Sequence, residues 1–517
     1  MVAKKSRKRI EPVGASGKSK KRASAKKSAS SKASVKQGAG GKKSSKKKQA
    51  AAATPQSVLV VNMIPKSLSG EDNQDSEPTI AVNPANPQQI ASSAFTPDPG
   101  GGPRAPIYIS GDGGQTWTLN AIVPSSVQDG SITADITVSF GSSSNILYAG
   151  IIRLPFPDDK TRLNILRTKN FQSATAMNIL VDRTGNGVDQ PYVQATTMTD
   201  GPDKGKDRLY VGDNDFSAPG GKTATIDQSL NAGTSTPTFK SLRIESRKTP
   251  GQDGPTIRPV IHKDGTVYAI FHSWRTFNGQ TGKGTADIVV VRDDKGGASP
   301  VPFAGLIDPG DGKAGVRVAL GTKFNFNGFL GKQRTGGDVS IAVDPNNSDI
   351  LYIAYNDDQG PIYALHVLRS TDRGQTWSPQ LRNISNALNG ALAINNKGTV
   401  GFLYQQLTGT AAAQKWVTKL ELSTDGTTWN SITLAQTLAN APSKIFDPYL
   451  GDYDHLMAVG KDFYGIFSAS NMPDKANFPQ GVVYQRNANF NTHTLLNVDN
   501  VTPVHVSIDP FFFKATM

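Results

Sequence analysis

The stretch SGDGGQTW, residues 110–117, recurs as STDRGQTW at 370–377 and, one residue shorter, as STDGTTW at 423–429. Each copy follows a short apolar run and ends on a tryptophan. The serine and aspartate side chains can bond backbone groups in a turn, and the glycine permits a positive φ. The tryptophan can then cover an apolar core from the next strand. The residues predicted to build these turns are Ser110, Asp112, Gly114, Trp117, Ser370, Asp372, Gly374, Trp377, Ser423, Asp425 and Trp429.

The octets belong to a longer repeat, which begins at residue 57 and runs in units of roughly 50 to 80 residues. AVNPANPQQI at 81–90 matches AVDPNNSDIL at 342–351, and both place an Asx-Pro turn between two apolar strands. A third strand and an octet, or a degraded form of it, follow each strand pair. Seven such units predict an all-β fold over residues 54–517, a seven-bladed β-propeller, with six blades as the alternative. The run SVLVVNMI at 57–64 is expected to close the ring as an outer strand of the last blade.

The composition of the 517 residues fits many turns and no disulfides, with Gly 51, Pro 32 and Cys 0. The absence of cysteine excludes thiolate metal sites as well. The six histidines have no zinc-ligand spacing, no glycine-rich phosphate loop opens a helix, and no serine nucleophile elbow is present.

A basic tail, residues 1–53, precedes the repeats. Residues 1–49 hold 18 of the 56 Lys and Arg and one of the 42 acidic residues, a charge of +17. The remaining 38 basic and 41 acidic residues give the rest of the chain a charge of −3. Because it has almost no large apolar side chains, the tail is predicted to be disordered. Its charge favours a polyanion, which is nucleic acid, acidic polysaccharide or an anionic membrane surface, and the alternative is a solubilising extension without a specific partner.

No apolar segment of signal-peptide or membrane-spanning length follows the basic start. We therefore expect no ordinary signal peptide and no transmembrane segment. The compartment stays open between the cytoplasm and export by a non-standard route.

The octet resembles the Asp-box, or bacterial neuraminidase repeat, of the sialidase-like propellers. EPTIAVNP at 77–84 and DPYLGDYDHLMA at 447–458 also resemble segments of bacterial sialidase-like proteins. The resemblance covers most of residues 57–517. It implies a propeller that binds a glycan and, in its enzymatic form, hydrolyses it as an exo-sialidase or another glycosidase. Asp-boxes also occur in lectins, lyases and sorting receptors, so the fold is implied more firmly than the activity.

Sialidases of this fold resemble one another in three arginines that hold the substrate carboxylate, a Tyr–Glu nucleophile pair and an Asp acid/base. The family's early Arg-Ile-Pro motif is absent here, and the only glutamates after residue 57 are Glu71, Glu77, Glu245 and Glu421. The residues whose positions suit the family's arginine and tyrosine roles are Arg104, Arg153, Arg275, Tyr355 and Tyr453.

A propeller brings the starts of its first strands and the ends of its second strands to one mouth of the central channel, opposite the octet turns. The acidic residues expected before the first strands are Glu77, Asp135, Asp189, Asp253, Asp338 and Asp447. They either bind backbone amides that fix each blade or provide cation-binding or acid/base groups.

The ends of the second strands supply two further sets of candidates. The ligand-binding candidates are His272, Trp274 and Asp357. The candidates for a Ca²⁺ site, by their hard oxygen ligands, are Asp213, Asp215, Asp357 and Asp358, although neither cluster has the spacing of a calcium loop.

Two functions remain open from the sequence. One is a sialidase-like propeller that binds, or binds and hydrolyses, a glycan at the channel mouth. The other is a non-enzymatic binding or scaffold propeller that its basic tail attaches to polyanions.

Overall fold

The computed structural model describes residues 53–95, 107–124, 132–154, 161–183, 188–216, 223–247, 257–445 and 447–517. Contacts within the chain divide it into two compact units, Met1–Gln49 and Ala50–Met517. The first unit contains the charge of the predicted basic tail and lies outside the described residues. All described strands belong to the second unit.

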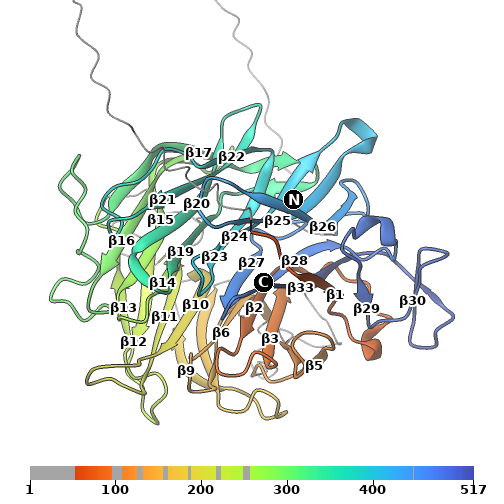
Figure 1. Cartoon of the computed structure of the whole chain (residues 1–517), viewed down its shortest axis with the longest axis horizontal. Coiled ribbons are helices and arrows are strands. Elements are labelled where there is room, and N and C mark those ends of the chain that lie inside the picture. The colour runs from red at the N-terminus through yellow and green to blue at the C-terminus, as the bar shows by residue number, and fades with distance from the viewer. Residues whose placement is uncertain are drawn as a thin grey trace, which may run out of the picture. The chain divides into compact units, whose positions relative to one another are not determined.

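The described residues are almost entirely β, which confirms the all-β prediction (Figure 1). Six antiparallel sheets follow one another in this part of the chain, each built from strands that are consecutive in sequence. They are β2 (Ser76–Val82), β3 (Ile90–Phe95), β4 (Ile107–Ser110) and β5 (Thr118–Asn120); β6 (Ile132–Phe140), β7 (Leu147–Leu154), β8 (Arg162–Thr168) and β9 (Asn178–Arg183); β10 (Val188–Thr197), β11 (Asp207–Asp215), β12 (Ala224–Ser229) and β13 (Lys240–Arg243); β14 (Arg258–Ile261), β15 (Val267–Asn278), β16 (Lys283–Asp293), β17 (Val316–Leu330) and β18 (Gln333–Thr335); β19 (Val339–Asp344), β20 (Asn347–Asp358), β21 (Tyr363–Ser370) and β22 (Arg382–Ser385); and β23 (Ala387–Ile394), β24 (Val400–Thr408), β25 (Lys415–Ser423) and β26 (Asn430–Leu438).

A further sheet joins the two ends of the second unit. Its strands, in spatial order, are β27 (His455–Val459), β28 (Asp462–Ser470), β33 (Ile508–Thr516), β1 (Ser57–Asn62) and β29 (Val483–Tyr484). β1 lies antiparallel to β33, with Ser57 opposite Thr516 and Asn62 opposite Phe511. The predicted closing strand therefore does pair with the last sheet, and it ends at Asn62.

Little other regular structure is present in the described residues. A small sheet holds β30 (Ala488–Asn489), β31 (Thr494–Leu496) and β32 (Pro503–Val504), and the short 3₁₀ helices are η1 (Lys66–Leu68), η3 (Ala411–Ala413) and η4 (Lys475–Asn477). No helix in the described part of the chain is long and apolar enough to cross a membrane.

The first strands of successive sheets pack against one another in the order β2, β6, β10, β14, β19, β23 and β27, and β27 packs back against β2. Sheets arranged radially around such a closed ring form a β-propeller. Both faces of each sheet meet a neighbour, so β2 and β23 are buried along their whole lengths. This explains why their sequences, SEPTIAV and ALNGALAI, lack a regular alternation of apolar and polar residues.

The three octets connect the third and fourth strands of the first, fifth and sixth described sheets. In the first octet Asp112 Oδ1 accepts a hydrogen bond from the Thr116 amide at 3.0 Å, and Ser110 Oγ accepts one from the Gly114 amide at 2.9 Å. The indole nitrogen of Trp117 donates to the Gly114 carbonyl at 3.0 Å. The other two octets make the same kinds of bonds. Each turn therefore satisfies several of its backbone amides with its own side chains.

Two details favour a structural role for the octets. Gly114 has φ of 91°, and a Cβ there would lie 2.1 Å from the ring of Phe512, so this position requires glycine. The amides of Thr428 and Thr427 hold the pKa of Asp425 below its ordinary value. A carboxylate that stays ionised in this way is a poor proton donor, which favours the role in the turn.

Candidate functional site

Several first strands carry a β-bulge close to the channel mouth. The pairing register shifts between Ser76 and Thr79 in β2, and comparable shifts occur in β6, β10 and β23. Glu77, Gln190 and Asn389, within three of these bulges, have φ of 51°, 51° and 57°. Non-glycine residues rarely adopt such backbone angles, and bulges that impose them often lie next to binding sites. The bulges therefore indicate a candidate binding site at this end of the ring.

The segment 447–454 links β2, β18 and β23 at the mouth. Gln333 accepts a hydrogen bond from the Leu450 amide at 2.6 Å and donates one to the Gly451 carbonyl at 2.9 Å. Asn389 donates to the same carbonyl at 3.2 Å. Gly451 has φ of 96°, and a Cβ there would lie 2.4 Å from the Glu77 amide nitrogen. The close approach of this segment to β2 is thus possible only with glycine.

Two acidic residues, Glu77 and Asp135, lie close to Asp452 of this segment. Burial raises the pKa of Glu77 well above its ordinary value, and Asp135 and Asp452 raise it further. The Glu77 carboxyl is hydrogen-bonded to that of Asp135 and accepts from the Asp452 amide at 3.3 Å. Arg334 forms an ion pair with Asp452. Burial and the two neighbouring carboxyl groups therefore favour the protonated form of Glu77.

An arginine lies between two tyrosine rings at the same mouth. The guanidinium carbon of Arg258 is 4.2 Å from the ring centre of Tyr192 and 4.8 Å from that of Tyr453. Its NH2 nitrogen is 3.3 Å from Asp338 Oδ1. Both charged side chains are buried, and the two aromatic faces add cation–π attraction to the ion pair.

The hydrogen bonds of His455 determine where its proton sits. Its Nδ1 accepts from the Ile80 amide at 3.2 Å, so the proton is on Nε2. Nε2 lies 3.0 Å from the Tyr192 hydroxyl and donates to its oxygen. Burial, together with a smaller effect of Arg258, lowers the pKa of His455 to about 3. The ring is therefore neutral at physiological pH.

A cavity of about 210 Å³ lies within the ring, and it is lined by residues from or next to β2, β6, β10, β14, β19, β23 and β27. Its polar lining includes Tyr192, Arg258, Asp338, Asp454 and His455, and its remaining walls are mostly aliphatic. Asp454 is 5% exposed, and neither of its carboxyl oxygens has a hydrogen bond of ordinary geometry to the described residues. Burial and then Asp338 raise its pKa well above the ordinary value, and the Ser468 amide offsets only part of this. The cavity thus contains a carboxyl group whose protonated form burial favours, and that form can donate and accept hydrogen bonds.

We expect Asp454→Asn to change how stability depends on pH. Above the ordinary aspartate pKa of 3.8 the unfolded chain releases this proton while the folded protein keeps it. The stability of the wild-type protein therefore falls as pH rises from that value toward the raised folded-state pKa, by about 1.4 kcal/mol per pH unit for this group. The free energy of unfolding of Asp454→Asn, measured with urea, should increase relative to wild type over this range. If the free energies of unfolding of the two proteins changed in parallel with pH, Asp454 would be ionised in the fold and this prediction would be wrong.

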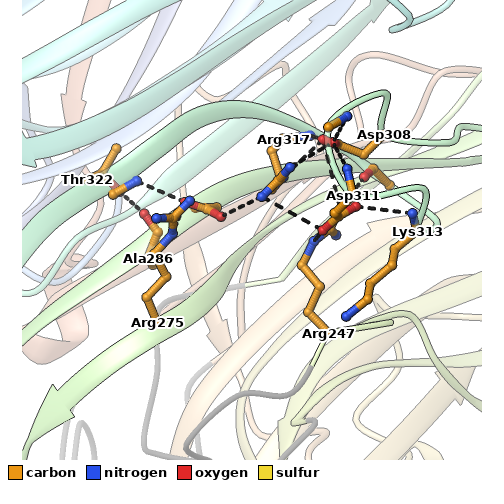
Figure 2. A network of polar contacts seen from close by, with 12 residues as sticks. Arg247, Arg275, Ala286, Asp308, Asp311, Lys313, Arg317 and Thr322 are labelled. Carbon is orange, nitrogen blue, oxygen red and sulfur yellow. Dashed lines mark hydrogen bonds and ion pairs between the residues drawn. The ribbon is translucent and has the colours of Figure 1, made fainter.

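The predicted arginines do not form one pocket among the described residues, and Arg104 lies outside them. Arg153 donates to Asn164 at 3.0 Å within the second sheet. The Arg275 side chain is 45% exposed, and its Nε is 2.5 Å from Asp287. Figure 2 shows Arg275 at one end of an ion-pair network that continues through Arg317 to Asp308, Asp311 and Arg247. None of these residues lines the cavity.

The two predicted tyrosines have different surroundings. Tyr355 on β20 is buried and packs against His366, with ring centres 5.1 Å apart. Tyr453 stands at the mouth against Arg258. Within this pair, only Tyr453 adjoins the polar cluster.

Two of the predicted ligand-binding residues are packed inside the protein. Trp274 is 4% exposed, and its ring lies 4.9 Å from Phe324 and 5.0 Å from Phe277. His272 is also buried, and burial lowers its pKa to about 3. We expected from the sequence that both residues face a ligand. In the structure Trp274 packs against Phe324 and Phe277, and His272 also lies next to Phe324, so both are removed from solvent. Asp357 is half-buried and accepts hydrogen bonds from the Lys323 amide and the Gln359 side chain.

The predicted calcium ligands lie in two clusters, Asp213 and Asp215 on β11 and Asp357 and Asp358 on β20. Arg183 lies 3.0 Å from Asp213 and 2.6 Å from Asp215, so a guanidinium takes the place in which a cation was expected. Asp358, beside Asp357 on β20, accepts from the Gly360 amide at 3.1 Å.

Sequence reasoning named Glu77, Asp135, Asp338 and Tyr453 but missed the partners that complete the cluster, which are Tyr192, Arg258, Arg334, Asp454 and His455. One signal was available. Pro78 and Pro191 stand inside apolar strand runs, and proline within a strand indicates a bulge or an edge. Those prolines lie within the bulges of β2 and β10.

No family model and no curated protein matches the chain. Solved structures resemble it at low identity. The phage phi92 endosialidase is 11% identical, with a TM-score of 0.40, over 89% of this chain and 69% of its own. The GH93 α-L-arabinofuranosidase of Fusarium graminearum is 11% identical, with a TM-score of 0.42, over 68% and 93%. A PL25 ulvan lyase is 11% identical, with a TM-score of 0.43, over 77% and 92%. The assignment of the fold rests on the sheets and their contacts.

Proposed function

We propose that the protein is a glycan-binding, seven-bladed propeller of the Asp-box, sialidase-like kind, whose site lies at the channel mouth opposite the octet turns. The observation that carries the proposal is the cavity whose polar lining combines the Asp454 carboxyl, the Tyr192 hydroxyl and the Arg258–Asp338 pair. Sugar hydroxyls both donate and accept hydrogen bonds, as the carboxyl and phenol groups do. The aliphatic walls suit the C–H faces of a sugar ring, and most small-ligand sites combine apolar walls with a few fixed polar groups.

The geometry supports binding better than hydrolysis. Glycosidases generally separate their two carboxyl groups by about 5 Å or more so that they flank the scissile bond. Glu77 has the raised pKa of a general acid, but its carboxyl is hydrogen-bonded directly to Asp135. No trio of arginines converges on the cavity among the described residues. The enzymatic form of the proposal would need Glu77 and its neighbours to separate when substrate binds.

Tyr192→Phe tests the binding site with the loss of one oxygen atom. We expect the wild-type protein to be retained on a glycan array and the variant to bind the same glycan about tenfold more weakly, the effect of losing one polar contact. Asp358→Asn, at a residue outside the cavity lining, is the matched control and should bind as wild type does.

A fluorogenic α-sialoside separates the two forms of the proposal, and binding without turnover is the expected result. If the wild-type protein released the fluorophore and Glu77→Gln did not, hydrolysis would be established. A folded protein that retained no glycan, or equal losses in Tyr192→Phe and Asp358→Asn, would contradict the proposed site.

The charge division of the sequence favours one further role. Residues 1–49 carry +17 and the rest of the chain −3. We propose that the tail attaches the propeller to a polyanion, and this applies whether or not the propeller binds glycans.

A further inference from the structure

Three carboxyl groups meet where the first sheet adjoins the closing sheet. Glu71, Asp75 and Asp509 each place a carboxyl oxygen within 4.8 Å of the others. Glu71 follows η1, Asp75 directly precedes β2, and Asp509 is on β33. None of the three lines the central cavity.

The arginine at this cluster, Arg486, makes its closest contact with one of the three acids. Arg486 NH1 is 3.0 Å from Asp509 Oδ2, and both side chains are fully buried. Asn62 and Asn471 also donate to Asp509, at 2.8 and 2.6 Å. The same guanidinium reaches only to 4.0 Å from Glu71 Oε2. One guanidinium thus faces three acids. The carboxylate to which it donates a hydrogen bond is that of Asp509.

A buried hydroxyl provides an independent sign of a ligand. Tyr108 is fully buried, and its hydroxyl has no hydrogen-bond partner among the described residues. Asp75, Glu71 and Asp509 all act electrostatically on this hydroxyl, so it lies in the neighbourhood of the three acids. Glu71 Oε2 likewise has no hydrogen-bond partner in this part of the chain. Unpaired buried oxygens are costly, and two of them beside a cluster of three acids favour a missing electropositive centre.

We propose that Glu71, Asp75, Asp509 and the Tyr108 hydroxyl bind a hard divalent cation, with Ca²⁺ as the best fit. Ca²⁺ takes six to eight oxygen ligands in flexible geometry, whereas Mg²⁺ demands a near-ideal octahedron and keeps more of its waters. Backbone carbonyls or water complete the shell. The cation joins the segment before β2 to β33, and so it stabilises the closure of the ring. This site is separate from the proposed glycan site and from the Asp213–Asp215 and Asp357–Asp358 pairs.

Thermal unfolding of chelator-treated protein tests the site with the metal alone. We expect CaCl₂ at about 100 times its dissociation constant to raise the melting temperature by about 3 °C, with a smaller rise for MgCl₂ and none for NaCl at equal ionic strength. The calcium shift should disappear in Asp75→Asn and in Glu71→Gln, and it should persist in Asp358→Asn. The absence of a calcium shift in the wild-type protein would overturn the proposal, as would a shift that survives in both cluster variants or is lost in Asp358→Asn.

Terbium luminescence provides a second readout that does not depend on unfolding. Tb³⁺ replaces Ca²⁺ at oxygen sites and is excited through a tyrosine only at close range. We expect sensitised emission that CaCl₂ competes away and that Tyr108→Phe, which preserves the ring, reduces severalfold. Undiminished emission in Tyr108→Phe would place the bound ion elsewhere.

Discussion

Removal of residues 1–49 is expected to abolish binding of this protein to heparin and to duplex DNA. That segment carries +17, whereas the rest of the chain carries −3 and should repel a polyanion. The expected change is from retention on a heparin column at about 0.1 M salt to elution in the flow-through, because the non-specific attraction is electrostatic. Circular dichroism and thermal unfolding of the truncated protein should match those of the full chain.

The salt dependence of the full chain tests the same idea more sharply. For duplex DNA the logarithm of the binding constant falls with the logarithm of salt with a slope of about −0.9 per phosphate neutralised. A flexible chain rarely engages every lysine at once, so we expect a slope well short of one set by all 17 net charges of the tail. A matched control keeps the length of the tail and replaces its lysines with glutamine, and it should behave like the deletion. If the truncated protein kept its heparin affinity at about 0.1 M salt, the basic surface would have to lie on the propeller.

The features that could be predicted from sequence are those encoded locally. An octet specifies its turn through residues within eight positions, so Ser110, Asp112 and Gly114 could be assigned from the pattern alone. The strand run at 57–64 was recognisable because it is apolar and stands apart from any repeat unit. Its pairing with the last sheet followed from the need of a ring to close, whereas the partner strand β33 is known only from the structure.

The candidate site is encoded differently, and most of it could not be predicted. Tyr192, Arg258 and Tyr453 come from three separate segments and meet only because the ring brings them to one mouth. Whether a residue such as Trp274 faces solvent depends on neighbours such as Phe324 on another strand, which a pattern in one strand does not reveal. A bulge shifts side chains between the faces of a strand, so the period of two that guides sequence reading fails close to the channel mouth.

Arg258→Met is expected to lower the free energy of unfolding by about 3–5 kcal/mol, the usual cost of removing one partner from a buried ion pair. Asp338, 6% exposed, would lose the guanidinium that lies 3.3 Å away, and Tyr192 and Tyr453 would lose the cation between their rings. Methionine fills a similar volume, so the loss would report on charge rather than on a cavity. Urea denaturation with a constant m-value would measure it.

The double variant Arg258→Met/Asp338→Asn separates stability from recognition. Replacing both charges removes the uncompensated carboxylate, so most of the lost stability should return, since neutral replacements of buried pairs are often tolerated. Glycan binding should not return, because the cavity would still lack the guanidinium and the carboxylate among its polar groups. If Arg258→Met proved as stable as wild type, Asp338 would have to be neutral in the fold. If the double variant bound glycan normally, the pair would serve only the architecture of the ring, and the binding site would have to be sought outside the cavity.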